Sequence, residues 1–293
     1  MEHSASPHIQ TDKKGLMQTI RHRLDGEALT DSWGDPMVRG KIKGSAVLFL
    51  LTLRKSGPNG SYEPCLLLNK RSAKVLQPGD LCCPGGGVAP LDRVLSAALH
   101  LPLSPLGKWP AWRKWKRSDR QKANGLALLL ATALREAWEE MRLNPLKVSF
   151  LGPLQVQRLI MFNRRIFPLA GWVPRDQNLV PNWEVARIVH IPLRRFFETR
   201  RYARYRLTFN TAEGQAQRKE DFPCFIHNGC EGDEILWGAT FRITVDFLQR
   251  VFGFIMPDLG TAPIITRRLG STYFNGSSAL NRSALRTEQR DDD

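Results

Sequence analysis

The stretch Arg135-Glu136-Ala137-Trp138-Glu139-Glu140 places three carboxylates within five consecutive residues of a segment that has the character of a helix. Glu136 and Glu140 are one helical turn apart and Glu139 lies beside both, so the three side chains can converge on one side of the helix. Like charges at this spacing repel one another, and a hard divalent cation such as Mg²⁺ would offset that cost, because it prefers oxygen ligands. The alternative is a solvated acidic face, the usual interpretation of an isolated glutamate pair.

A glycine-rich loop, Pro84-Gly85-Gly86-Gly87-Val88-Ala89-Pro90, lies upstream of the acidic segment. Three successive glycines permit positive φ angles and a close approach of the backbone to a ligand, while the prolines stiffen both ends of the loop. Such loops are common, and an ordinary turn would explain this one if it stood alone. A glycine loop followed by an acidic helix is a more specific combination.

Together, the loop and the acidic segment resemble the signature of the Nudix hydrolases, a family that splits nucleoside diphosphates linked to another moiety. Gly86 takes the first signature position, Asp92 replaces the first Glu, and Arg142 stands where a closing Gly is usual. The residues that match the family's helix outright are Arg135, Glu136, Glu139 and Glu140. Because 42 residues separate Asp92 from Arg135, more than is usual in the family, the resemblance implies an insertion, expected at residues 93–125. A surface insertion costs little loop-closure entropy.

Elements outside the signature resemble the coenzyme A pyrophosphatase branch of this family. The segment Leu67-Leu68-Asn69-Lys70-Arg71-Ser72 is similar to the branch's Leu-Leu-Thr-x-Arg-Ser and leads through Gly79 to the glycine loop. Glu184-Val185 and Trp237-Gly238 are similar to two of its downstream elements. The departures from the branch are Asn69 in place of Thr, Cys83 in place of Phe, and Lys74 as the nearest substitute for a missing Arg.

The resemblance implies an α/β fold, the Nudix α/β/α sandwich with a mixed sheet. It also implies a metal-dependent hydrolase that cleaves the diphosphate of coenzyme A or an acyl derivative, releasing 3′-phosphoadenosine 5′-phosphate and a 4′-phosphopantetheine product. One alternative is a hydrolase of another nucleoside diphosphate derivative, such as ADP-ribose, a dinucleotide or capped RNA. The other is a Nudix-fold binding protein that has lost catalysis. Asp92 and Arg142 would suit that loss, whereas the three retained glutamates argue against it.

The resemblance further implies roles for individual residues. Glu136, Glu139 and Glu140 would bind Mg²⁺ or Mn²⁺, and the metal would activate a water for attack on phosphorus. Arg135, four residues before Glu139, has the right offset to hold that carboxylate. Glu139 and Glu184 are the two candidates for the general base. The residues expected to bind substrate are Arg71, Gly85, Gly86 and Gly87.

The composition is that of a globular chain, with 42% hydrophobic and 24% charged residues and a net charge of +15. Such a charge attracts polyanions, so the expected partner is a small molecule linked to a nucleoside diphosphate, while nucleic acid is compatible but not favoured. The longest apolar run near the N-terminus, residues 46–53, is too short to span a membrane, and no secretory signal is evident. Five cysteines without CxxC pairs indicate free thiols in a reducing cytoplasm. A homodimer is also considered.

The pattern of apolar residues predicts a Nudix domain at residues 41–254, between an N-terminal extension (1–40) and a C-terminal extension (255–293) with a disordered tail. Strands are expected at 47–53, 65–69, 148–151, 166–173 and 186–191, with a late hairpin at 205–209 and 222–227. Further helices are expected at 16–24, 193–197 and 237–252, and Asn144-Pro145 is expected to end the acidic helix.

The insertion contains many basic residues between positions 108 and 122, interleaved with Trp109, Trp112 and Trp115. Basic and aromatic residues together could clamp phosphates and stack on bases. The interpretation we favour is that the tryptophans, at helical spacing, pack the insertion onto the domain while the charges face water.

Overall fold

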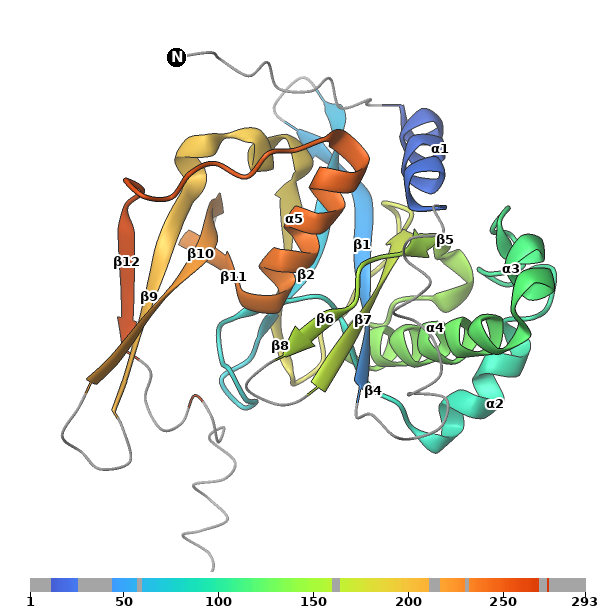
Figure 1. The fold of residues 1–293 in the computed structure, drawn as a ribbon. Coiled ribbons are helices and arrows are strands. Elements are labelled where there is room, and N and C mark those ends of the chain that lie inside the picture. The colour runs from blue at the N-terminus through green and yellow to red at the C-terminus, as the bar shows by residue number, and fades with distance from the viewer. Residues whose placement is uncertain are drawn as a thin grey trace, which may run out of the picture.

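The computed structural model describes residues 12–25, 44–56, 60–159, 164–210, 217–229, 232–268 and 273. Within these residues the strands form two sheets, and helices flank the larger one (Figure 1). No helix in this part of the chain combines the length and the apolar character needed to cross a membrane.

The larger sheet has eight strands among the described residues, in the order β3-β2-β1-β7-β5, with β4 and β8 added beside β1 and β2 and with β6 beside β7. β1 and β7 run parallel while the other pairs are antiparallel, so the sheet is mixed. Its strands are β1 (Gly44–Ser56), β2 (Ser61–Arg71), β3 (Leu81–Cys82), β4 (Gly85–Gly87), β5 (Ser149–Pro153), β6 (Gln157–Leu159), β7 (Arg164–Trp172) and β8 (Val185–Pro192).

The smaller sheet has four strands in the described part of the chain, in the order β11-β10-β9-β12. These are β9 (Tyr202–Asn210), β10 (Gln217–Gly229), β11 (Gly232–Trp237) and β12 (Ile264–Arg268). β9 and β10 form the late hairpin expected from the sequence, and β12 pairs with β9 in parallel.

Alternate residues of β1 pack into two different cores. Leu48 and Leu50 belong to the core that contains the apolar side of α4 (Arg120–Met141). Phe49 and Leu51 belong to the core that contains residues of α1 (Lys13–Leu24) and α5 (Gly238–Phe252). Because successive side chains of a strand point to opposite faces, a helical layer covers each face, and Figure 1 shows α4 and α5 on opposite sides of β1 and β7. The expected α/β sandwich with a mixed sheet is confirmed.

The range 93–125, expected as an insertion, holds most of α2 (Pro90–Ala98), all of α3 (Trp112–Ser118) and the first residues of α4. Trp109, Trp112 and Trp115 are only 2%, 3% and 9% exposed, and they belong to the same core as α4. Trp109 meets the ring of Phe150 edge to face, with the centroids 4.9 Å apart. The packing interpretation of the tryptophans is confirmed, since their rings are covered.

The ends of some elements differ from the sequence-based expectation. α4 ends at Met141, before the expected stop at Asn144-Pro145, because Arg142 adopts a left-handed conformation with φ 57°. The expected helix at 193–197 is a 3-10 helix, η4 (Leu193–Phe197), and two more such turns are η2 (Pro145–Lys147) and η5 (Thr199–Arg201). Strands β3, β6, β11 and β12 were not expected. The expected tail beyond 275 and the connection at 26–43 lie outside the described residues.

Candidate active site

The glycine loop and the acidic helix lie against each other, although 42 residues separate Asp92 from Arg135. The N–H of Gly85 donates a hydrogen bond to Oε2 of Glu140 at 3.3 Å. A Cβ atom on Gly86 would lie 2.4 Å from Cδ of Glu136, and one on Gly85 would lie 2.2 Å from the carbonyl oxygen of Ala46. Gly85 also has φ 150°, which favours glycine. The loop therefore needs glycine to pass between β1 and the glutamates of α4.

Arg135 is the centre of the hydrogen-bond network on this face of α4. Its Nε and Nη2 donate to the two carboxylate oxygens of Asp92, at 2.7 and 3.2 Å. The same side chain donates to Glu139 at 3.0 Å and to Glu136 at 2.8 Å, and it also reaches the carbonyl of Gly87 at 3.2 Å. The hydrogen bond to Asp92, followed by those to the two glutamates, raises the pKa of Arg135 further above its usual value. The predicted contact between Arg135 and Glu139 is confirmed.

Asp92 is completely buried and connects α2 to α4. In addition to Arg135, its carboxylate accepts hydrogen bonds from the N–H of Ala89 at 2.7 Å and from the hydroxyl of Thr132 at 2.9 Å. Burial acts to raise the pKa of Asp92, but the hydrogen bonds, led by those from Arg135, outweigh it and hold the pKa below its usual value. The side chain is therefore a charged anchor beneath the loop.

Glu140 is the most deeply buried glutamate of the acidic segment, with 9% exposure. Its Oε2 accepts a hydrogen bond from Nδ2 of Asn69 at 2.9 Å as well as the one from Gly85. Burial, together with the charges of Glu136 and Glu184, raises the pKa of Glu140 to about 8. Burial also raises the pKa of Glu136 above its usual value. This part of the site holds more negative charge than its surroundings neutralise.

Glu184 and Arg71 face Glu140 across a small cavity of about 60 Å³. The segment before β8 is held there by its backbone, since the N–H of Asn182 donates to the carbonyl of Glu140 and the N–H of Ser72 donates to the carbonyl of Glu184, each at 2.8 Å. The structure thus brings two sequence-predicted residues from β2 and β8 to the acidic helix. Lys74, considered as a substitute for a missing Arg, is exposed and does not line this cavity.

Asn69 and Cys82 are two residues of this cavity that the sequence analysis did not assign to the site. Asn69 first drew notice only as a departure from the pattern Leu-Leu-Thr-x-Arg-Ser. It is 1% exposed, and its Oδ1 has no hydrogen-bond partner among the described residues. Strand alternation is the signal that could have found Asn69, because residues two apart on β2 share a face, and Arg71 was already a candidate.

The donor chemistry of the glutamates fits a hard divalent cation. Glu136, Glu139 and Glu140 each use one carboxylate oxygen in a hydrogen bond, and the other oxygen has no donor within the described residues. As they stand, however, no three His, Cys, Asp or Glu side chains in the described ranges are close enough to hold one ion. The side chain of Glu139 is 51% exposed and has the freedom to turn toward the other two.

Comparison with known proteins gives matches in fold only. The sequence matches no protein-family model and no curated protein. A Nudix hydrolase from M. smegmatis matches 51% of this chain and 70% of its own, with 16% identity and a TM-score of 0.32. An Ap4A hydrolase from C. elegans matches 54% of this chain and 85% of its own, with 12% identity and a TM-score of 0.33. A MutT/nudix family protein from Enterococcus faecalis matches 83% and 76%, with 12% identity and a TM-score of 0.37.

Proposed function

We propose that this chain is a metal-dependent pyrophosphohydrolase of the Nudix type, acting on a diphosphate linked to a nucleoside. The observation that carries the proposal is the contact between the two halves of the signature. Arg135 binds Asp92, Glu136 and Glu139 at once, and the backbone of the glycine loop touches the glutamates of α4. An acidic surface with no function would not need this convergence of loop, guanidinium and partly buried carboxylates.

The residues would share the work as follows. Glu136, Glu139 and Glu140 would hold Mg²⁺ or Mn²⁺, which neutralises a diphosphate and activates water when bound. Arg135 positions Glu136 and Glu139 through its hydrogen bonds, and Gly85 holds Glu140 through its N–H. Arg71, on the same small cavity as Glu140, would bind an oxygen of the substrate diphosphate.

Between the two candidates for the general base, the geometry favours Glu184. Glu184 lines the cavity beside Glu140 and forms no ion pair with a cationic side chain in the described part of the chain, so its carboxylate is available to accept a proton from water. Glu139 is held by Arg135 in an ion pair. A base must come within hydrogen-bond reach of the attacking water, and the small cavity is where Glu184 and the acidic helix meet.

Coenzyme A or an acyl derivative is the substrate that we propose. The resemblance of residues 67–72 to the coenzyme A pyrophosphatase branch supports it, and two of these residues, Asn69 and Arg71, line the cavity with Glu140 and Glu184. The net charge of +15 also suits a substrate that carries a phosphate in addition to its diphosphate. ADP-ribose, a dinucleotide or capped RNA would share the diphosphate but not these features as a set.

The test is turnover by the wild type and by Glu139→Gln, Glu140→Gln and Glu184→Gln, with Mg²⁺ and with Mn²⁺. The substrates are coenzyme A, its 3′-dephospho form, ADP-ribose and a reduced dinucleotide, with products resolved by chromatography. We expect each variant to lose turnover by orders of magnitude, whereas Glu198→Gln, which changes an ion pair between η4 and η5, should keep it.

Three outcomes separate the alternatives. Preference for ADP-ribose or the dinucleotide would remove coenzyme A and keep the hydrolase. Full activity of Glu139→Gln and Glu140→Gln at limiting metal would show that the acidic helix is only a surface. Binding of nucleotides without turnover of any of the four would favour a Nudix-fold binding protein.

A further inference from the structure

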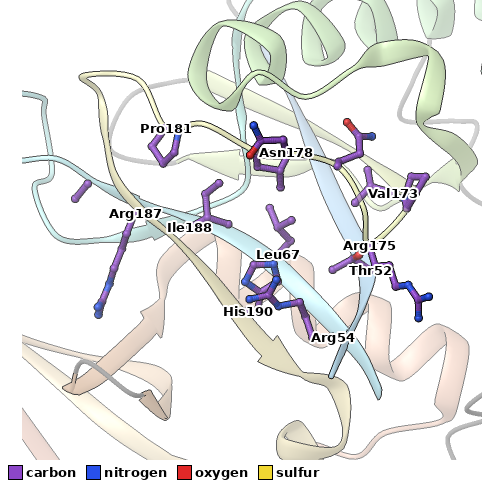
Figure 2. A pocket seen from close by; sticks show the side chains of 14 residues that line it. Thr52, Arg54, Leu67, Val173, Arg175, Asn178, Pro181, Arg187, Ile188 and His190 are labelled. Carbon is purple, nitrogen blue, oxygen red and sulfur yellow. The ribbon is translucent and has the colours of Figure 1, made fainter. Parts of the chain in front are cut away.

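A second, larger cavity of about 390 Å³ opens on the larger sheet (Figure 2). Its floor is formed by Leu67 of β2 together with Ile188 and His190 of β8, and residues 173–181 contribute one wall. A cavity of this size is within the range of small-molecule sites, roughly 300–1,000 Å³. The candidate active site described above does not include it.

The two cavities follow each other along β2. Leu67 lines the larger cavity, while Asn69 and Arg71 line the small one beside Glu140. Residues two apart on a strand point to the same face and are separated by about 7 Å. The paired strand continues in the same way, because His190 lies opposite Leu67 whereas Val185 lies opposite Arg71. One ligand could therefore lie along the strands with its diphosphate at Glu140 and a further part in the larger cavity.

The charge of the larger cavity is positive. Its lining contains Arg54, Arg175, Arg187 and His190 and no aspartate or glutamate. Arg187 is neutralised by an ion pair with Glu234, and Figure 2 shows its side chain directed away from the other basic groups. Burial and the neighbouring Arg54 lower the pKa of His190 to about 4, so the imidazole is neutral at pH 7.

Arg54 and Arg175 are the two cations of the cavity that remain without a carboxylate. Neither forms an ion pair within the described residues, and Arg175 stacks on the ring of Tyr62, 4.2 Å from its centroid. Arg54 lies beside His190 on the floor of the cavity (Figure 2). Guanidinium groups bind phosphate oxygens through parallel hydrogen bonds, so the pair suits a phosphate monoester.

We propose that the larger cavity holds the part of the substrate beyond the scissile diphosphate, and that Arg54 and Arg175 bind a phosphate monoester on that part. The ligand class is a nucleotide that carries a phosphate on its ribose as well as the diphosphate. The proposal rests on the proposed function for the position of the diphosphate. A separation of about 7 Å between successive inward residues of β2 is one that a single ribose can bridge between two phosphate groups.

The experiment measures binding without catalysis, by titration calorimetry with adenosine 3′,5′-bisphosphate and with adenosine 5′-monophosphate. The proteins are the full-length wild type, Arg54→Gln, Arg175→Gln, the double variant and Arg113→Gln, a control on the exposed side of α3. We expect the wild type to prefer the bisphosphate by about 10-fold or more, since a charge-assisted hydrogen bond contributes that much. The double variant should lose the preference, each single variant should lose part of it, and Arg113→Gln should keep it.

The same proteins are then compared in turnover. We expect the ratio of KM for coenzyme A to KM for 3′-dephospho-coenzyme A to rise in the double variant and to be unchanged in Arg113→Gln. No preference for the bisphosphate in the wild type, or the same preference in the double variant, would overturn the inference. If the preference depends on Arg54 and Arg175 but no substrate is hydrolysed, the cavity stands and the hydrolase proposal fails.

Discussion

The three glycines of β4 provide a series in which one added methyl group has three different consequences. In Gly85→Ala the new Cβ would lie 2.2 Å from the carbonyl oxygen of Ala46 and 2.6 Å from the Cα of Val47. Both atoms belong to the backbone of β1 and cannot turn aside. With φ at 150° as well, we expect strain and overpacking together to destabilise the fold by about 2–4 kcal/mol.

Gly86→Ala should affect activity more than stability. Its Cβ would lie 2.4–2.7 Å from the carboxylate atoms of Glu136, and these are the far end of a flexible side chain. Glu136 can rotate away, but it then loses its hydrogen bond to Arg135 at 2.8 Å, a loss of about 1 kcal/mol. The larger effect is on the proposed metal site, because one of its three carboxylates is displaced. We expect a strong loss of turnover in a stably folded protein.

Gly87→Ala is the matched control, since nothing lies within 4 Å of its added Cβ. It should leave turnover unchanged and, by restricting the unfolded chain, could stabilise the fold by about 0.5 kcal/mol. The measurements are urea unfolding followed by circular dichroism and turnover at saturating Mg²⁺. Equal stability of Gly85→Ala and Gly87→Ala would refute the packing of β4 on β1. Wild-type turnover in Gly86→Ala would refute the role of Glu136.

Three further predictions concern stability. Asp92→Asn should lower the free energy of unfolding by about 3 kcal/mol in urea titrations, because a buried guanidinium loses its charged partner, and a loss below about 1 kcal/mol would count against the anchor. Arg142→Gly should raise the melting temperature, with a gain of about 1 kcal/mol, because glycine adopts positive φ freely; an unchanged or lower melting temperature would contradict this. His190→Gln should weaken the loss of stability between pH 6.5 and 4. In that window the unfolded histidine takes up a proton that the folded one, whose pKa is lowered from 6.5 to about 4, does not. Thermal melts across this range should show the wild-type slope in the exposed control His22→Gln, and the same slope in His190→Gln would be the contrary result.

The elements with strong periodicity were predictable from the sequence, and so was part of the site. The apolar run of α4 and the hairpin of β9 and β10 were located correctly, and the pairing of Arg135 with Glu139 followed from their offset on a helix. The hydrogen bond between Asn69 and Glu140 could not be predicted in this way. It joins residues 71 positions apart in the sequence, and their meeting depends on how α4 packs on the sheet.

The larger cavity shows the same limit more clearly. Arg54 lies on β1, Arg175 follows β7 and His190 lies on β8, so no local spacing connects them. The net charge of +15 indicated an anionic partner but not where it would bind. Short strands such as β3 and β6, with two and three residues, are too brief to show an alternation and are defined by their neighbours in the sheet.

A signature divided by 42 residues can remain intact because the cost of a longer loop is small compared with the contacts at its ends. Each doubling of loop length costs about 0.6 kcal/mol in closure entropy, whereas one hydrogen bond to a charged group contributes about 1.5–3 kcal/mol. Arg135 makes two such bonds to Asp92, and the buried tryptophans add apolar contacts within the inserted segment. The contact between the loop and the helix is therefore the property on which the proposed site depends, and their separation along the chain is free to vary.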